Sequence, residues 1–147
     1  MRGLMLGEHL RRCASVGSRL VSIVVGKRIL VVEDDEDNAA LLRVALGPEG
    51  YELAFAQNLG DAMNAVVASD PEIILLDIAL PQRLEGLRLV DWYFRQASGR
   101  AKIIVLSAVG REVLDEVRQD PRVAAVVAKP FSVDALLALV ASVAVGD

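Results

Sequence analysis

Residues 28–35 read RILVVEDD, a short run of aliphatic residues that ends in three consecutive carboxylates. Val, Ile and Leu without polar residues between them are typical of a strand that is buried on both faces of a parallel sheet. The stretch therefore predicts a central strand whose carboxyl end carries an acidic group.

Similar short strands recur along the chain and alternate with segments of helical spacing. Further strands are expected at 51–56, 73–76, 102–106 and 123–128, with the more polar 51–56 at an edge. Helices are expected from Asp37 or Asn38 to Gly47, near 60–68, 86–97 and 110–118, and from Ser132 to 145. This alternation predicts the α/β class, a (βα)5 doubly wound, flavodoxin-like, five-stranded parallel sheet with helices on both faces.

The composition excludes several other kinds of protein. A chain of 147 residues has room for one ordinary domain, and 54% hydrophobic residues are too many for a disordered chain. The single cysteine, Cys13, and the single histidine, His9, cannot form a disulfide framework or a zinc site between them.

Charge divides the chain into two parts. Residues 1–27 hold five basic residues against one acidic residue, whereas residues 28–147 hold eleven basic and nineteen acidic residues. We therefore expect 1–26 to be a basic N-terminal extension, disordered or helical, and 27–147 to be the folded domain. The acidic domain is a poor match for nucleic-acid phosphates, and no apolar run reaches the ~18–20 residues of a membrane span. A cytoplasmic protein without direct nucleic-acid binding is expected.

Polar residues follow four of the expected strands, where a doubly wound sheet places its ligands. Glu33 and Asp34 follow the first strand, Asp77 follows 73–76, Ser107 follows 102–106, and Lys129 follows 123–128. Carboxylates gathered at one point repel one another unless a cation lies between them, and their hard oxygens suit Mg²⁺. A hydroxyl and an ammonium beside that ion are what a phosphoryl group needs.

Four motifs closely resemble the receiver domain of bacterial two-component response regulators. They are ILVVEDD at 29–35, IILLDIALP at 73–81, IVLSA at 104–108 and AKPF at 128–131, and the resemblance covers about residues 27–145. It implies that Asp77 accepts a phosphoryl group from a histidine of a partner kinase. It also implies that Glu33, Asp34, Asp77 and the backbone carbonyl of Ala79 hold Mg²⁺.

The resemblance assigns roles to other residues as well. Lys129 would pair with a phosphoryl oxygen, and the Lys129–Pro130 peptide bond would be cis. Ser107 would act as a switch that hydrogen-bonds the phosphoryl group. Val126 stands at a second switch position, where many receivers have an aromatic residue, so an aromatic rotamer switch is not expected. Asp35 is interpreted either as a turn carboxylate at the start of the first helix or as a further group at the metal.

Three functions remain open. The first is a stand-alone receiver without an output domain, which acts by binding partners. The second is a Mg²⁺-dependent phosphohydrolase with an aspartyl nucleophile, although Ala79 stands where such enzymes need a second Asp. The third is a receiver-like scaffold that is not phosphorylated, which we keep open because the loop between Asp77 and Gly86 is one residue longer than usual, with a bulge expected at 82–85.

The expected partners follow from the same resemblance. They are a histidine kinase or a histidine phosphotransfer protein, and a downstream protein. The segment 132–145 is apolar around most of its circumference, which favours a homodimer through the 110–145 face, with Leu114 and Val126 in the contact. The alternative is a helix sunk in the core with alanines on its outer side.

Overall fold

The computed structural model describes residues 25–78, 86–96, 99–108 and 110–146. Five parallel strands form one sheet in the order β2-β1-β3-β4-β5. The strands are β1 (Arg28–Val32), β2 (Glu52–Ala56), β3 (Ile73–Asp77), β4 (Lys102–Ser107) and β5 (Val123–Ala128). The predicted fold class is confirmed, and the polar strand β2 lies at an edge as expected.

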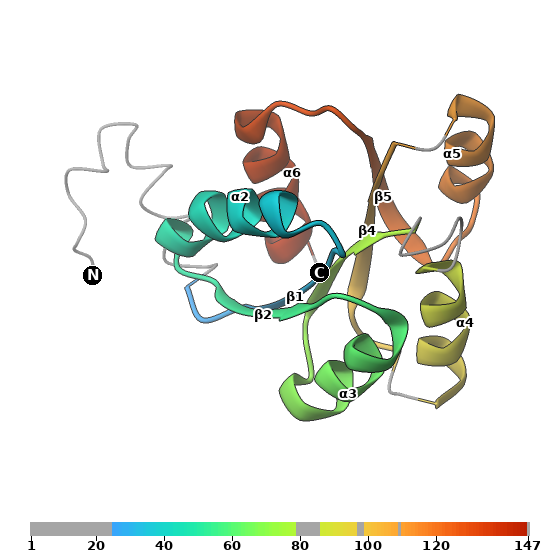
Figure 1. Ribbon diagram of the computed structural model, residues 1–147, viewed down its shortest axis with the longest axis horizontal. Helices are drawn as coiled ribbons and strands as arrows, with labels where there is room; N and C mark the ends of the chain where they lie inside the picture. Colours follow the sequence, from blue (N-terminus) through green and yellow to red (C-terminus); the bar gives the residue numbers. More distant parts are fainter. Residues whose placement is uncertain (1–24, 79–85, 97–98, 109, 147) are drawn as a thin grey trace.

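Helices cover both faces of the sheet (Figure 1). They are α2 (Glu36–Leu46), the short 3-10 helix η2 (Gly47–Glu49), α3 (Leu59–Ser69), α4 (Gly86–Gln96), α5 (Arg111–Arg118) and α6 (Val133–Val145). In the described part of the chain, none of them is long and apolar enough to cross a membrane. Of the predicted extension 1–26, residues 1–24 lie outside the described residues.

The apolar residues of the strands divide between two core clusters, one on each face of the sheet. One cluster packs β-strand residues against α3, α4 and α5, and the other packs them against α2 and α6. Every residue of β3 is buried, because this strand lies in the middle of the sheet with helices on both sides. Its uninterrupted aliphatic sequence is the expected pattern for that position.

Two helix starts show how local sequence fixes the boundaries. Ser132 caps α6 by accepting a hydrogen bond from the backbone N–H of Ala135 at 3.2 Å, as predicted. The prediction for α2 was wrong: Asp35 caps it, accepting from Asp37 N at 2.8 Å and Asn38 N at 3.1 Å. The reason is that the carboxylate of Asp35, two residues before Asp37, reaches the first free N–H groups, so the helix begins at Glu36.

Helix α6 packs one stripe of side chains into the core. Leu136, Val140 and Ala144 are buried on it, whereas Ala135 and Ala138 are exposed. The interpretation of a core helix with alanines outside therefore describes it better than an all-round apolar helix. Leu114, expected in a dimer contact, is buried within the domain at 3% exposure, so it is not available to a partner.

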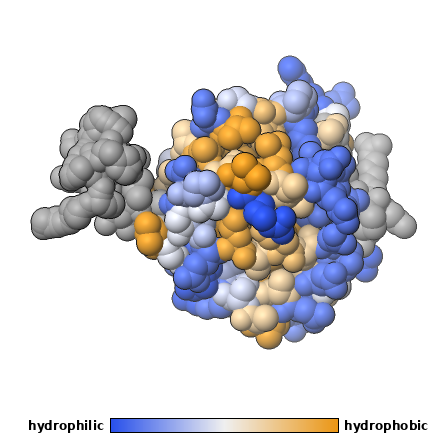
Figure 2. Space-filling model, turned by 60° about the vertical axis from the view of Figure 1, so that its left-hand side comes forward, coloured by the Kyte–Doolittle hydropathy of each residue, from blue (hydrophilic) through white to orange (hydrophobic). Residues whose placement is uncertain are grey.

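Large exposed apolar side chains are few among the described residues. They are Val25, Leu41, Val44 and Val67. Figure 2 shows a face of the molecule on which apolar side chains form a band from the top to the bottom of the domain, with a hydrophilic patch in its middle and hydrophilic side chains along its right-hand side.

Candidate functional site

The carboxyl ends of the central strands bring the predicted acidic residues together. Strand pairing sets Val32 beside Leu76, so Glu33, which follows β1, lies next to Asp77, the last residue of β3. Carboxylate oxygens of Glu33, Asp34 and Asp77 lie within 4.8 Å of one another. Glu33 and Asp77 are buried and Asp34 is exposed, so the cluster is open to solvent on one side.

Lys129 reaches this cluster from the end of β5. Its Nζ donates to Glu33 Oε1 at 2.8 Å and to Asp77 Oδ2 at 3.3 Å. The peptide bond between Lys129 and Pro130 is cis, as the resemblance implied. Within the described part of the chain, one ammonium therefore pairs with two carboxylates of a cluster of three.

Burial and charge act in opposite directions on the two ends of this ion pair. Burial raises the pKa of Glu33 above its usual value, although the hydrogen bond and charge of Lys129 pull it down. Burial alone would lower the pKa of Lys129, but the hydrogen bond to Glu33 and the charges of Asp77 and Glu33 outweigh it and raise that pKa. Lys129 is accordingly held as an ammonium.

The three carboxylates fit a hard divalent cation. Their donor atoms are all oxygens, which Mg²⁺ prefers, and the exposed side leaves room for water ligands. A divalent charge would also offset the repulsion between Glu33, Asp34 and Asp77 that Lys129 offsets only in part. Ala79, whose carbonyl was predicted as a further ligand, lies outside the described residues, as do residues 82–85 of the lengthened loop.

The two predicted switch residues occupy different environments. Ser107 closes β4, is fully buried, and its backbone oxygen accepts from Lys129 N at 3.0 Å. This contact places Ser107 next to the lysine that reaches Asp77. Val126 lies in the middle of β5, paired with Val105, and packs half-buried against the core. Asp35 points its carboxylate at the start of α2, which supports its interpretation as a turn carboxylate.

Gly86 is a site residue whose role sequence reasoning missed. A Cβ atom built on it would lie 2.5 Å from Ile78 Cα and 2.7 Å from the backbone oxygen of Asp77. Its N–H donates to Ile78 O at 2.9 Å. The start of α4 therefore presses directly on the backbone of the acidic site, which only a residue without a side chain allows. The sequence signal that could have indicated this role is a glycine at the start of the predicted helix 86–97, directly after the loop that follows Asp77.

Replacing Gly86 by Ala is expected to destabilise the protein by about 1–3 kcal/mol, because the new methyl group meets backbone atoms that cannot turn aside. Urea denaturation measures the effect. The matched control is Gly60→Ala, in the first turn of α3, where the new Cβ would meet only Asn58 Oδ1 at an ordinary 3.5 Å, so this variant should be neutral or slightly stabilising. Equal stability of the two variants would contradict the close approach.

Comparison with known proteins agrees with this geometry. A family model described as "Response regulator receiver domain" matches residues 29–141. Protein Rrf1 of Nitratidesulfovibrio vulgaris is 37% identical over 115 residues, which are 77% of this chain and 79% of that protein.

Solved structures with similar folds include a signal receiver domain and a response regulator protein. The signal receiver domain of a LuxO repressor protein from Vibrio parahaemolyticus has a TM-score of 0.73 at 26% identity, covering 82% of this chain and 91% of the other. The response regulator TrrA from Thermotoga maritima, solved in complex with Mg²⁺ and BeF, has a TM-score of 0.66 at 31% identity, covering 80% of this chain and 98% of the other.

Proposed function

The chain belongs to the response regulator receiver domain family of two-component signalling, and we propose that it takes a phosphoryl group onto Asp77 to regulate partner binding. The observation that carries this proposal is the convergence of Glu33, Asp34, Asp77 and Lys129 at one sheet edge. The TrrA structure supports it, because that relative was solved with Mg²⁺ and BeF.

Glu33, Asp34 and Asp77 would hold Mg²⁺, together with the backbone carbonyl of Ala79. When bound, the ion would neutralise negative charge on the phosphoryl oxygens as they approach the acidic cluster. The residues present fit it, because they offer clustered oxygens with a solvent-facing side.

Asp77 would act as the nucleophile. Its carboxylate oxygen attacks phosphorus, and a new P–O bond forms as the P–N bond to the donor histidine breaks, with the electron pair passing to the imidazole nitrogen. Lys129 already contacts Asp77 Oδ2 at 3.3 Å, so a short movement would bring its ammonium to a phosphoryl oxygen. The product is an acyl phosphate on Asp77.

Ser107 would then convert phosphorylation into a change of shape. Strand pairing sets Leu106 beside Asp77, so Ser107 follows directly at the same edge of the sheet, and its backbone oxygen accepts from Lys129 N. A hydrogen bond from its hydroxyl to the phosphoryl group would shift the segment that leads into α5. Because Val126 occupies the second switch position, no aromatic side chain on β5 would change its rotamer during this shift.

The expected partners stay as the resemblance implied. A histidine kinase or a histidine phosphotransfer protein would supply the phosphoryl group, and a downstream protein would bind the 27–147 domain in one of its two states. A homodimer through the 110–145 face would have to use exposed residues of α5 and α6, because Leu114 is buried. We propose a signalling protein in the cytoplasm that assists its own phosphorylation and dephosphorylation.

The decisive experiment is intact mass spectrometry after incubation with acetyl phosphate, with Mg²⁺ or with EDTA. We expect a gain of one phosphoryl group per chain with Mg²⁺ and no gain with EDTA, because the acidic cluster repels the donor without a cation. No gain in either condition, with the protein folded, would favour the non-phosphorylated scaffold. Continuous release of inorganic phosphate over many turnovers would favour the phosphohydrolase.

A further inference from the structure

The outer side of α2 carries an apolar stripe that no described part of the chain covers. Ala40, Leu41 and Val44 are exposed there, Val44 to 71% of its surface. Residues three and four positions apart lie on the same side of a helix, so these side chains form one continuous surface, the α2 stripe. Two of the four large apolar side chains that are exposed among the described residues belong to it, and a third, Val25, is the first described residue.

Val25 lies close to the carboxyl end of α2. Gly50 follows η2, which continues directly from α2, and a Cβ atom built on Gly50 would lie 2.8 Å from Val25 Cγ2. The next residue, Gly26, donates its N–H to Gly50 O at 2.9 Å. The chain therefore enters the domain directly beside the end of this helix.

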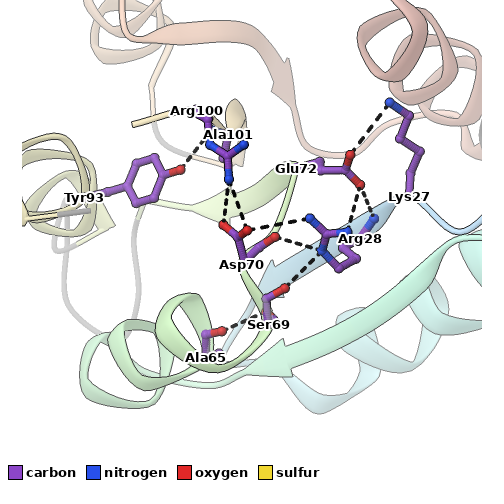
Figure 3. Close-up of polar contacts among 9 residues, drawn as sticks. All are labelled: Lys27, Arg28, Ala65, Ser69, Asp70, Glu72, Tyr93, Arg100 and Ala101. Carbon is purple, nitrogen blue, oxygen red and sulfur yellow. Dashed lines mark hydrogen bonds and ion pairs between the residues drawn. The ribbon is translucent and has the colours of Figure 1, made fainter. Parts of the chain in front are cut away.

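The start of β1 holds this entry point from the other side. Arg28 N donates to Glu72 Oε1 at 2.9 Å, and Lys27 Nζ pairs with the same carboxylate at 3.8 Å. Figure 3 shows Lys27 and Arg28 beside Glu72, with Asp70 next to Arg28. The point to which residues 1–24 are attached is therefore set by contacts within the domain.

The start of α2 and the segment 1–24 carry opposite charges. Four consecutive carboxylates, those of residues 34–37, are exposed at the start of the helix. The only basic residue of α2, Arg43, lies in the last turn, with its guanidinium 4.1 Å from the centroid of the Phe55 ring. Residues 1–24 hold four arginines against one glutamate. The acidic start of α2 therefore attracts this segment.

The length of the segment fits a path along α2. The eleven residues of the helix are about 16–17 Å long at ~1.5 Å per residue. Residues 13–24, which separate Arg12 from Val25, would span about 18 Å as a helix and at most about 40 Å as an extended chain. In either conformation Arg11 and Arg12 can reach the acidic start of α2, while the apolar residues that follow them pass over the α2 stripe.

The small size of the α2 stripe favours a tethered occupant. A stable complex between separate molecules buries about 800 Å² on each partner, and three side chains, one of them an alanine, offer far less. A segment of the same chain needs less contact, because its tether gives it an effective concentration in the millimolar range. A contact with a Kd of about 1 mM, too weak for separate molecules at ordinary concentrations, would therefore still form in cis.

We propose that residues 1–24 bind in cis to the α2 stripe. Apolar side chains of the segment would cover the stripe, and Arg11 and Arg12 would lie near the carboxylates at the start of the helix. Because Asp34 belongs to the acidic cluster, the bound segment would also lie beside that cluster. The docking does not require phosphorylation, so it stands or falls separately from the proposed function.

The test uses Cys13, the only cysteine of the chain, as the attachment site for a nitroxide spin label. The label broadens the signals of nearby amides in NMR spectra of the full ¹⁵N-labelled protein. A segment that made no contact would also stay near its attachment point, because twelve flexible residues span about 19 Å on average. The informative quantity is therefore the change in broadening that substitutions in the α2 stripe cause.

The Leu41→Ser/Val44→Ser variant removes the apolar contacts. We expect strong broadening at the amides of residues 34–37 in the parent and loss of most of it in this variant, because the loss of two apolar contacts weakens docking about tenfold. The matched control is Val67→Ser, exposed on α3 at the other face of the sheet, which should leave the broadening unchanged. Val44→Ser alone gives a second measurement if the double variant does not fold.

A mixing experiment separates binding in cis from binding between molecules. ¹⁵N-labelled Cys13→Ser protein, which takes up no nitroxide, is mixed with spin-labelled protein that contains no ¹⁵N. We expect no broadening of α2 amides in this mixture. Broadening there would mean that another copy of the chain occupies the α2 stripe, and it would overturn the proposal. Equal broadening in the parent and in Leu41→Ser/Val44→Ser would also overturn it.

Discussion

Replacing Asp77 by Asn is expected to abolish phosphorylation by acetyl phosphate completely, while the protein stays folded. The amide has the shape of the carboxylate but is not nucleophilic, so no acyl phosphate forms. Asp77 is also one of three clustered carboxylates, so its neutralisation relieves repulsion and should not lower stability. Intact mass with Mg²⁺ measures the loss, and urea denaturation checks the fold.

The matched control is Asp35→Asn. Asp35 lies two residues after Glu33, yet its carboxylate caps α2, and Asn caps helices about as well as Asp. This variant should gain one phosphoryl group as the parent does. If Asp35→Asn lost phosphorylation and Asp77→Asn kept it, the acceptor would be a different carboxylate and the assignment of Asp77 would be wrong.

The fold was predictable because each local signal agreed with the global one. The strand 73–76 has aliphatic residues at every position, which fits only a strand covered on both faces, and the structure buries all of them. The strand extends one residue further than predicted, so Asp77 ends the strand instead of following it. The exact ends of strands and helices depend on the hydrogen bonds of single residues, which the hydrophobic periodicity of the sequence does not show.

The acidic cluster was predictable for a related reason. Parallel strands end at a common edge, so residues that follow them in the sequence must meet in space, and Glu33, Asp77 and Lys129 do so. Sequence alone did not show that Lys129 bridges Glu33 and Asp77, because that depends on side-chain conformation. Nor did it show the approach of Gly86 to Ile78, which depends on where α4 docks.

The sequence did not predict the ion pairs at the starts of β1 and β4. In this cluster, Glu72 and Asp70 pair with Lys27, Arg28 and Arg100. Its cations belong to segments more than 70 residues apart in the chain, and each one taken alone is typical of a solvated charge beside a strand. Only the pairing of β1 with β3 and of β3 with β4 brings their starting residues to one edge.

Replacing Lys129 by Met is expected to slow phosphorylation by acetyl phosphate about 100-fold or more. The ammonium lies 3.3 Å from Asp77 Oδ2, where it can neutralise a phosphoryl oxygen in the transition state, and loss of one such group costs ~10²–10³ in rate. Stopped samples analysed by intact mass give the rate. The control is Lys102→Met, which removes a lysine from the start of β4, at the opposite edge of the sheet from Asp77, and should leave the rate unchanged.

The same variant is expected to lose about 2–4 kcal/mol of stability near neutral pH without Mg²⁺, because it removes the ammonium that pairs with the buried Glu33 and Asp77. The loss should depend on pH in a definite direction. Burial raises the pKa of Glu33 in the folded protein, so ionising it opposes folding and stability falls as pH rises from about 4.5 through the folded pKa. Removing Lys129 removes the contacts that pull this pKa down, so the fall becomes larger in the variant.

Urea denaturation of the parent and Lys129→Met at pH 5 and pH 8 measures this difference. The stability gap between the two proteins should widen from pH 5 to pH 8, since Glu33 can take up a proton at the lower pH and so relieve the unpaired charge. Lys129 itself, with a raised pKa, stays charged across this range in the parent, so its own titration does not change the stability with pH.

Mg²⁺ at pH 8 should narrow the stability gap, because a cation held by Glu33, Asp34 and Asp77 would replace part of the missing positive charge. A gap that is constant with pH would mean that Lys129 stabilises the fold through the packing of its side chain, and its charge would then have no part in holding the acidic site together.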